Sequence, residues 1–259
     1  MNFEARNIRF SHLSRHEPAR EVFRDLSLSI PGGECVGILG REGSGKTTLL
    51  NILGGLFPPS GGNLLIDGID PHSGEGRSAG IRLRMGFTFQ FPEEQFLCHT
   101  VAEEFSGVLR LRGVPGNEIA GRTREALGLM GLDPLETPGR SPFSLSLGES
   151  RRLALSLLHA IRPGGALLDE PTAGMDASGL DCTLGVIRKL RQAGTTVIIA
   201  THDVDLLSEI AERVLILGER GIASDGKSGA ILGDARLLAE HGYAVPGERT
   251  GLSSEDTGE

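Results

Sequence analysis

Residues 40–47 constrain the fold more than any other part of the chain, because they read Gly-Arg-Glu-Gly-Ser-Gly-Lys-Thr and match the pattern of a phosphate-binding loop. The apolar run 35–39 before them suits a buried parallel strand, and residues 48–53 after them can open a helix. Such a strand, glycine turn and helix N-terminus direct backbone N–H groups and the positive end of the helix dipole toward phosphate. The segment therefore predicts a site for a nucleoside triphosphate with its magnesium ion.

Several residues of this loop have predicted roles of their own. Lys46 would reach the β- and γ-phosphates, and the hydroxyl of Thr47 would bind Mg²⁺. Gly40 and Gly45 supply the backbone freedom that the turn requires. Only three of the 26 basic residues are lysines, so a lysine in this loop argues against a coincidental match. The remaining predicted nucleotide contacts in the loop are Gly43, Ser44 and Thr48.

The composition excludes several classes of protein. A net charge of −8 over 259 residues argues against a nucleic-acid partner, because phosphate backbones need basic surfaces. Three widely spaced cysteines give neither a complete disulfide framework nor a zinc pattern, which favours a reducing cytosol. The N-terminus shows no signal-peptide pattern, and no apolar run reaches the length of a membrane span. Any role at a membrane is therefore expected to depend on a partner.

Patterns typical of strands and helices alternate along most of the chain. Repeated β-α-β units predict an α/β fold, in which a parallel sheet carries helices on both faces. A helical stretch at 92–157 interrupts the alternation, and we expect it to form an inserted subdomain. The core would then comprise residues 1–91 and 158–225, followed by a short C-terminal extension at 226–246 and a disordered acidic tail at 247–259.

Two further strand ends carry side chains suited to phosphate chemistry. The apolar segment 166–168 ends in two adjacent carboxylates, of which Asp169 would hold the Mg²⁺ shell. Glu170, one residue further, would polarise the attacking water. The apolar segment 197–200 leads to His202, at the strand end where ligands bind in folds of this kind. We therefore expect His202 to contact the γ-phosphate.

The motif at 145–149, Leu-Ser-Leu-Gly-Glu, opens a strongly helical stretch. Ser146 and Glu149 have the spacing of a capping box, which satisfies backbone N–H groups at the start of a helix. The motif also resembles the signature of ABC-type ATPases, which usually reads Leu-Ser-Gly-Gly-Gln. Leu147 and Glu149 are the departures from that pattern.

Further motifs of the same family occur in the family's order along nearly the whole chain. Gln90 resembles its Q-loop glutamine, the Ala-Gly-Met-Asp segment 173–176 resembles its D-loop, and His202 resembles its switch histidine. With the phosphate-binding loop and the signature, these motifs identify the chain as a member of the ABC ATPases. The resemblance implies a P-loop NTPase (RecA-like) parallel-sheet core with an N-terminal antiparallel β-subdomain and an inserted α-helical subdomain.

The resemblance also implies a head-to-tail dimer that binds and hydrolyses ATP with Mg²⁺. Each ATP would lie between the phosphate-binding loop of one subunit and the signature helix of the other. Across that interface, Ser146 and the N–H of Gly148 would donate to the γ-phosphate. Gln90 would bind the metal together with Thr47 and Asp169. It would also link the occupancy of the metal site to a membrane partner. Whether the two subunits are identical or merely similar stays open.

Two more nucleotide contacts follow from the resemblance. Asp176, in the segment similar to the D-loop, would approach the nucleotide. In this family an aromatic ring that stacks on adenine precedes the phosphate-binding loop. The segment 7–12 suggests His12 for that place, with Phe10 as the alternative.

Residues 87–96, Phe-Thr-Phe-Gln-Phe-Pro-Glu-Glu-Gln-Phe, narrow the resemblance further. They are similar to the Q-loop region of ATPases from energy-coupling factor (ECF) importers, including the cobalt and nickel members. This similarity implies a membrane coupling subunit, a substrate-binding membrane subunit, and an ATPase held at the cytoplasmic face of the membrane that drives import of a vitamin or a transition-metal ion. A phenylalanine-rich groove suits an apolar helix of the coupling subunit. We expect Phe91 and Phe96 to face that helix.

Other functions are weighed against this one. A GTPase would carry an Asn-Lys-x-Asp motif, which is absent, and neither a GTPase nor a small-molecule kinase needs the motif at 145–149. ABC proteins outside transport usually have tandem ATPase halves or long coiled-coil insertions, and this chain has neither. The ATPase of a conventional ABC importer or exporter stays open, because only the segment flanking Gln90 discriminates against it.

Overall fold

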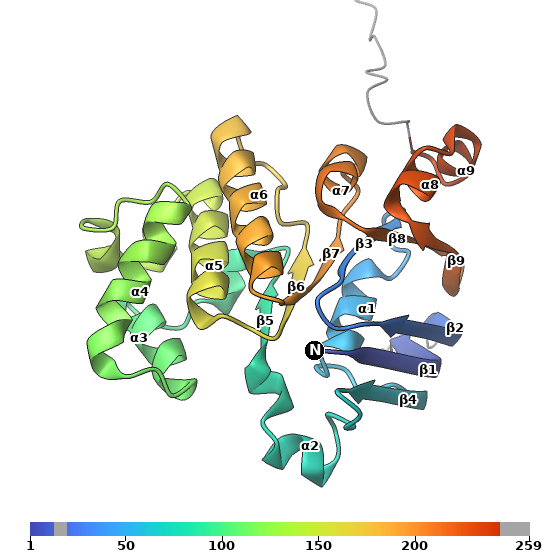
Figure 1. The fold of residues 1–259 in the computed structure, drawn as a ribbon, viewed down its shortest axis with the longest axis horizontal. Helices are drawn as coiled ribbons and strands as arrows, with labels where there is room; N and C mark the ends of the chain where they lie inside the picture. The colour runs from blue at the N-terminus through green and yellow to red at the C-terminus, as the bar shows by residue number, and fades with distance from the viewer. Residues whose placement is uncertain (13–19, 244–259) are drawn as a thin grey trace, which may run out of the picture.

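The computed structural model describes residues 1–12 and 20–243, which form two sheets and a group of helices (Figure 1). The smaller sheet is antiparallel, with the order β2 (Arg20–Ile30), β1 (Phe3–His12) and β4 (Gly61–Ile66). The larger sheet has the order β5 (Met85–Thr88), β6 (Gly165–Asp169), β7 (Thr196–Ala200), β3 (Cys35–Gly40), β8 (Arg213–Gly218) and β9 (Gly221–Lys227). Its strands are parallel except β9, which runs antiparallel to β8.

Strand β3 shows why the larger sheet is covered on both faces. All of its residues are buried, and side chains along a strand alternate between the two faces. Val36 and Ile38 belong to one apolar cluster, together with Leu49 of helix α1 (Lys46–Leu53). Leu39 belongs to a second cluster, which includes residues of α6 (Ala177–Gln192) and α7 (Val204–Ile210). The prediction of a parallel sheet with helices on both faces is confirmed.

The antiparallel sheet shares the first of these clusters. Phe3 and Ile8 of β1 and Phe23 of β2 are fully buried there, beside residues of α1. The implied N-terminal antiparallel β-subdomain is therefore present, and it packs against the helix that follows the phosphate-binding loop.

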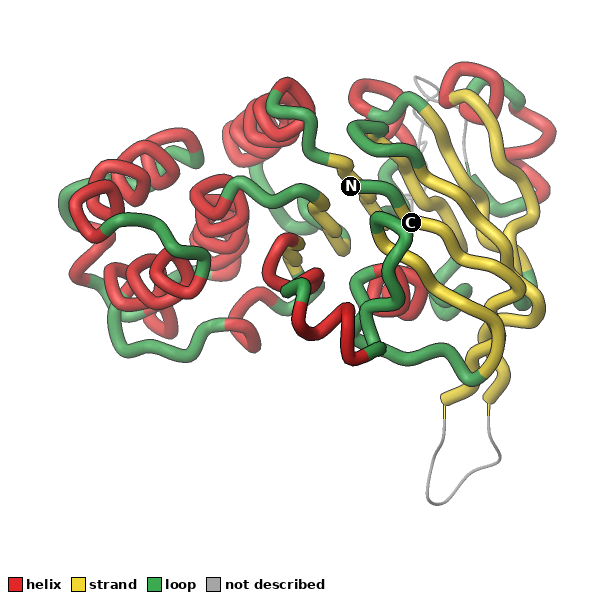
Figure 2. The backbone as a smooth tube through the Cα atoms, turned by 60° about the horizontal axis from the view of Figure 1, so that its bottom comes forward, coloured by secondary structure: helices red, strands yellow, loops and turns green. Residues whose placement is uncertain are grey.

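Helices of the inserted region gather at one side of the molecule, next to the end of the larger sheet that β5 forms (Figure 2). They are α3 (Val101–Leu111), α4 (Gly116–Leu129) and α5 (Leu147–Ile161), with the short turns η2 (Pro92–Gln95), η3 (Thr137–Gly139) and η4 (Pro142–Ser144). A third apolar cluster, which includes Phe105 and Leu153, holds them together. Helix α5 continues past the boundary predicted at residue 157 and ends at Ile161.

The remaining elements extend the core. Helix α2 (Gly74–Ser78) and the turn η1 (Ile81–Arg84) connect β4 to β5, and α8 (Ser228–Leu232) and α9 (Ala235–Glu240) follow β9. Strand β9 itself runs two residues beyond the predicted end of the core at residue 225. The end of the predicted extension, at 244–246, and the predicted acidic tail at 247–259 lie outside the described residues. Among the described helices, none has the length and apolarity needed to cross a bilayer.

Candidate nucleotide site

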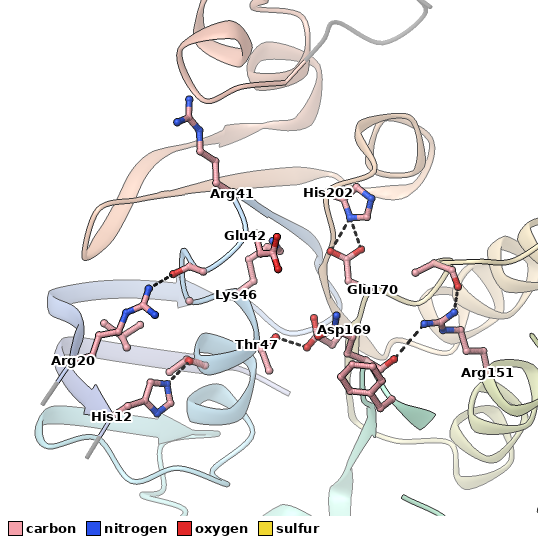
Figure 3. A pocket seen from close by; sticks show the side chains of 17 residues that line it. His12, Arg20, Arg41, Glu42, Lys46, Thr47, Arg151, Asp169, Glu170 and His202 are labelled. Carbon is pink, nitrogen blue, oxygen red and sulfur yellow. Dashed lines mark hydrogen bonds and ion pairs between the residues drawn. The ribbon is translucent and has the colours of Figure 1, made fainter. Parts of the chain in front are cut away.

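A cavity of about 580 Å³ opens where β3, β6 and β7 end, and the phosphate-binding loop forms part of its wall (Figure 3). Parallel strands present their carboxyl ends at one edge of the sheet, which is where such folds bind ligands. Segments far apart in the sequence meet here. The predicted site residues that line the cavity are His12, Gly43, Gly45, Lys46, Thr47, Thr48, Gln90, Asp169, Glu170 and His202.

The phosphate-binding loop leads directly into α1. Gly45, just before the helix, has φ = 100°, a backbone conformation that favours glycine. A Cβ atom there would lie only 2.7 Å from Val22 Cγ1 and 2.9 Å from the Phe23 ring, so a larger residue would have to displace these side chains. Nζ of Lys46 donates to the carbonyl of Gly40 at 2.7 Å. The first backbone N–H groups of α1 have no partner within the helix, which leaves them available to an anion.

Thr47 and Asp169 make a direct polar contact in the cavity. The hydroxyl of Thr47 donates to Oδ2 of Asp169 at 2.5 Å, and Asp169 is 5% exposed. Burial raises the pKa of Asp169, the hydroxyl of Thr47 opposes this, and the charge of Glu170 adds to it. One hydroxyl and one carboxylate oxygen are hard donors of the kind that Mg²⁺ takes from a protein when phosphates and waters supply the rest of its shell. The donor set therefore fits a magnesium ion.

Glu170 is held in place from two sides. Its φ of 47° lies in the left-handed region, which a residue other than glycine seldom adopts outside functional sites and turns. The hydroxyl of Thr201 donates to its Oε2 at 2.9 Å, and Nδ1 of His202 lies 3.0 Å from the same carboxylate. Thr201 is fully buried, whereas the side chain of His202 is mostly exposed. The carboxylate is thus oriented toward the cavity with an imidazole beside it.

Arg151 of α5 connects three parts of the site. Its guanidinium donates to the carbonyl of Ala173 and, at 3.3 Å, to the carbonyl of Gln90 (Figure 3). Gln90 itself follows β5 and is exposed at the wall of the cavity. A single side chain of the inserted helical region therefore fixes both the segment after Glu170 and the segment at Gln90.

His12, rather than Phe10, lines the cavity. Its Nε2 lies 3.1 Å from the hydroxyl of Thr48. Phe10 stacks on Phe57 with ring centroids 5.7 Å apart, and its ring meets the edge of His12 at 5.1 Å. Of the two residues considered for adenine, the structure therefore places only His12 at the cavity wall.

Other predicted site residues do not line this cavity. Gly40 and Ser44 are not among its lining residues. Ser146 and Gly148 lie at the start of α5, and Asp176 caps α6 by accepting from the N–H of Gly179 at 2.8 Å. The capping box predicted at α5 is confirmed, since Ser146 Oγ accepts from the N–H of residue 149 and the side chain at 149 accepts from the N–H of Ser146.

The expectation that Phe96 faces a partner is wrong. Phe96 is 4% exposed and belongs to the apolar cluster of the helical region, because the turn η2 carries it inward against α5. Phe91, which starts that turn, is 52% exposed, as expected. Leu97, one residue after Phe96, is 88% exposed. Three exposed apolar residues therefore remain in this segment: Phe89 and Phe91, which flank Gln90 in the sequence, and Leu97; we call them the Q-flank.

The sequence did not single out Thr201 or Arg151. Thr201 stands directly before His202 at the end of β7, so its position at a ligand-binding strand end was an available signal. The role of Arg151 had no local signal, because its acceptors are backbone carbonyls of two other segments.

Comparison with known proteins agrees with this geometry. The model of the ABC transporter family matches residues 23–173. The energy-coupling factor transporter ATP-binding protein EcfA2 of Clostridium perfringens is 32% identical over 247 residues, covering 95% of this chain and 87% of the relative. The cobalt import ATP-binding protein CbiO of Rhodobacter capsulatus is 37% identical over 223 residues, covering 86% of this chain and 79% of the relative.

Two solved structures share the fold. The dimeric ATP-binding cassette MJ0796 bound to ADP and Pi has a TM-score of 0.78 at 27% identity, covering 87% of this chain and 98% of the cassette. The structure of cbiO1 from Clostridium perfringens, part of the ABC transporter complex cbiONQ, has a TM-score of 0.72 at 25% identity, covering 92% and 93%. The family match spans more than half of the chain, and relatives above 30% identity cover most of it. The chain therefore belongs to the ABC transporter family, as one of its ATP-hydrolysing subunits.

Proposed function

We propose that this chain is an ATPase subunit of an ECF-type importer, held by membrane subunits at the cytoplasmic face of the membrane, where it powers uptake of a vitamin or a transition-metal ion. The observation that carries the proposal is the Q-flank, whose exposed Phe89 and Phe91 stand on either side of Gln90, a residue that lines the nucleotide cavity. Similarity to EcfA2 and CbiO supports the same class of transporter.

Hydrolysis would use the side chains gathered at the cavity. ATP would lie with its phosphates on the loop, contacted by Gly43, Ser44, Gly45 and Thr48, while Lys46 moves from the Gly40 carbonyl to the β- and γ-phosphates. Thr47, Asp169 and Gln90 would hold Mg²⁺, which neutralises charge on the phosphates. His12 would stack on adenine.

Glu170 would orient a water molecule and take its proton, so that the oxygen attacks the γ-phosphorus in line and ADP leaves. The buried hydroxyl of Thr201 keeps the carboxylate in position for this step. His202 lies beside the same carboxylate and would contact the γ-phosphate. Negative charge that develops on the γ-phosphoryl group during transfer would thus be stabilised by hydrogen-bond donors that are already held in place.

The second half of the site would come from another subunit in a head-to-tail dimer. Ser146 and Gly148 lie at the N-terminus of α5, where backbone N–H groups and the helix dipole favour an anion. They are not part of the cavity of their own chain, which suits a role in a partner's site. Asp176, at the N-terminus of α6, would approach the same shared nucleotide. A dimer of this kind is consistent with the dimeric cassette MJ0796.

The catalytic assignment is tested with Glu170→Gln. The variant should bind ATP, accumulate as a dimer in size-exclusion chromatography with ATP, and lose steady-state hydrolysis. Normal turnover by this variant would remove Glu170 from the mechanism.

The transporter class is tested with a matched pair of leucine variants. Leu97→Asp changes the Q-flank without touching the nucleotide cavity, and Leu135→Asp changes a leucine that is 80% exposed on the helical region. Tagged full-length chains would be used to recover partners from detergent-solubilised membranes of the source cell, with identification by mass spectrometry. We expect wild type and Leu135→Asp to recover a coupling subunit and a small substrate-binding membrane protein, and Leu97→Asp to recover neither. Recovery of ribosomes, DNA or only a conventional transporter would refute the proposal.

A further inference from the structure

The segment that follows α9 contacts the start of the phosphate-binding loop. These contacts join residues about 200 positions apart in the chain, and the hydrolytic mechanism above does not use them. Two side chains make them: Arg41 from the loop and Tyr243 from the segment. We call residues 240–243 the C-terminal clamp.

Arg41 reaches from the loop to the end of α9. Its Nε donates to the carbonyl of His241 at 3.0 Å, and its Nη2 donates to the carbonyl of Glu240 at 3.3 Å. Carbonyls at a helix C-terminus lack partners within the helix and carry the negative end of its dipole, so a guanidinium suits them. Gly242, with φ = 81°, makes the turn, and a Cβ atom there would lie 3.2 Å from Nε of Arg41. The turn is therefore shaped to admit this arginine.

Tyr243 makes the second contact between the clamp and the loop, at Gly40, the first residue of the loop. Its hydroxyl accepts a hydrogen bond from the N–H of Gly40 at 2.9 Å. The side chain is half-buried, and burial raises the pKa of its hydroxyl, with a smaller contribution from the negative charge of Glu170. The ring itself packs on the apolar cluster that holds α9 and β8. Tyr243 therefore ties the loop to the core through a partly buried hydrogen bond.

Gly40 is consequently held at both of its backbone polar groups. Tyr243 binds its N–H at 2.9 Å, and the Lys46 ammonium binds its carbonyl at 2.7 Å. A Cβ atom at Gly40 would lie 2.2 Å from Ser44 Oγ, so the loop is closely packed at this residue. Any change in the orientation of Gly40 would therefore move the resting position of Lys46, the cation that has to reach the phosphates.

We propose that the C-terminal clamp sets the conformation of the phosphate-binding loop for nucleotide, with Tyr243 as a positioning residue. The inference rests on the proposed nucleotide site. It extends that site to a segment of the chain outside the cavity. Because coupling between two sites is reciprocal, nucleotide bound on the loop should in turn stabilise residues 240–243.

The first test compares ADP binding by full-length wild type and Tyr243→Phe in isothermal titration calorimetry. Phenylalanine keeps the ring and removes only the acceptor for Gly40, so we expect Kd for ADP to rise about fivefold, the effect of one ordinary hydrogen bond. Arg236→Ala is the control, because Arg236 lies on α9, is almost fully exposed, and pairs with the side chain of Glu240 rather than with the carbonyl that Arg41 contacts. Its Kd should equal that of wild type.

The outcomes separate the two proposals. If wild type does not bind ADP, the proposed nucleotide site fails. If wild type binds ADP and Tyr243→Phe binds it equally well, the nucleotide site stands and the clamp is refuted. A weaker Kd in Tyr243→Phe, with a urea midpoint without nucleotide that matches wild type, supports positioning rather than a general loss of stability.

A second test needs no variant and therefore cannot be confounded by misfolding. Hydrogen exchange of wild type would be followed by mass spectrometry with and without saturating ADP. We expect ADP to slow exchange in the peptide that covers 235–243 as well as in the peptide that covers 40–48. Protection confined to 40–48 would show that nucleotide does not act on the clamp, and would overturn the inference.

Discussion

The fully buried hydroxyl of Thr201 donates a 2.9 Å hydrogen bond to Oε2 of Glu170, so a strand-end threonine positions the proposed catalytic carboxylate. Thr201→Val keeps the shape of the side chain and removes the donor. Because hydrogen bonds to charged groups are worth about 1.5–3 kcal/mol, we expect turnover to fall on the order of tenfold or more. The Kd for ADP should stay near the wild-type value. Steady-state ATPase assays and calorimetry measure the two effects.

Thr201→Ser is the matched control, because serine retains the hydroxyl while it removes a methyl group from a buried position. We expect it to recover most of the turnover. Equal losses in the valine and serine variants would show that packing, and not the hydrogen bond to Glu170, accounts for the effect.

Arg151 provides a second prediction, since it donates to the carbonyls of Ala173 and Gln90 from the helical region. Arg151→Ala leaves both carbonyls without this partner and uncouples α5 from the segment after Glu170. We expect turnover to fall about tenfold with little change in the Kd for ADP, because charge-assisted hydrogen bonds are lost while the phosphate-binding loop is intact. Arg124→Ala, on the exposed side of α4, should leave turnover unchanged. A loss in both variants would point to the stability of the helical region instead.

Local patterns were sufficient to predict part of the cavity wall. Asp169 and Glu170 stand at the carboxyl end of one apolar run, Lys46 and Thr47 begin the helix after the turn that follows another, and parallel strands bring such ends together. Strands β3, β6 and β7 were equally readable as continuous apolar runs, because they are buried on both faces and consist almost wholly of apolar residues and glycine.

Contacts that depend on tertiary packing were not predictable in this way. Phe96 and Leu97 are adjacent apolar residues, yet only the turn η2 determines which of them enters the core. Tyr243 meets Gly40 only because β8, β9, α8 and α9 return the chain to the carboxyl end of β3, and no spacing in the sequence encodes that path. The core was predicted to end at residue 225, two residues before the end of β9, which belongs to the main sheet.

The pair formed by Thr47 and Asp169 predicts a specific metal dependence. Asp169→Asn removes a carboxylate from the proposed Mg²⁺ site while it keeps the size of the side chain. We expect the Mg²⁺ concentration that gives half-maximal hydrolysis to rise at least about tenfold, since loss of even an outer partner of a metal site costs about 10–100-fold in affinity. Asp225→Asn, which instead breaks an ion pair with Arg213, should keep the wild-type requirement. Chelation of Mg²⁺ should abolish hydrolysis in both variants, and an unchanged requirement in Asp169→Asn would exclude Asp169 as a ligand.

Glu149 predicts how stability depends on pH. The guanidinium of Arg140, followed by the N–H of Ser146, lowers the pKa of Glu149 from 4.5 to about 2. A carboxyl group whose pKa is lower in the folded state stabilises the protein above its unfolded pKa, and this contribution is lost as the pH falls through the folded value. The stabilisation from Glu149 should therefore be complete above about pH 4.5 and should decline between pH 4.5 and pH 2.

Glu149→Gln tests this window, because glutamine can still cap the helix but cannot form the ion pair with Arg140. Urea denaturation at a series of pH values should show wild type more stable than the variant above pH 4.5, with the difference shrinking steadily as the pH is lowered. Glu118→Gln is the comparison, because Glu118 forms an exposed pair with Arg122 on α4, and such pairs contribute little at any pH. A difference between wild type and Glu149→Gln that stays constant from neutral pH down to pH 2 would mean that the ion pair with Arg140 is not what stabilises the start of α5.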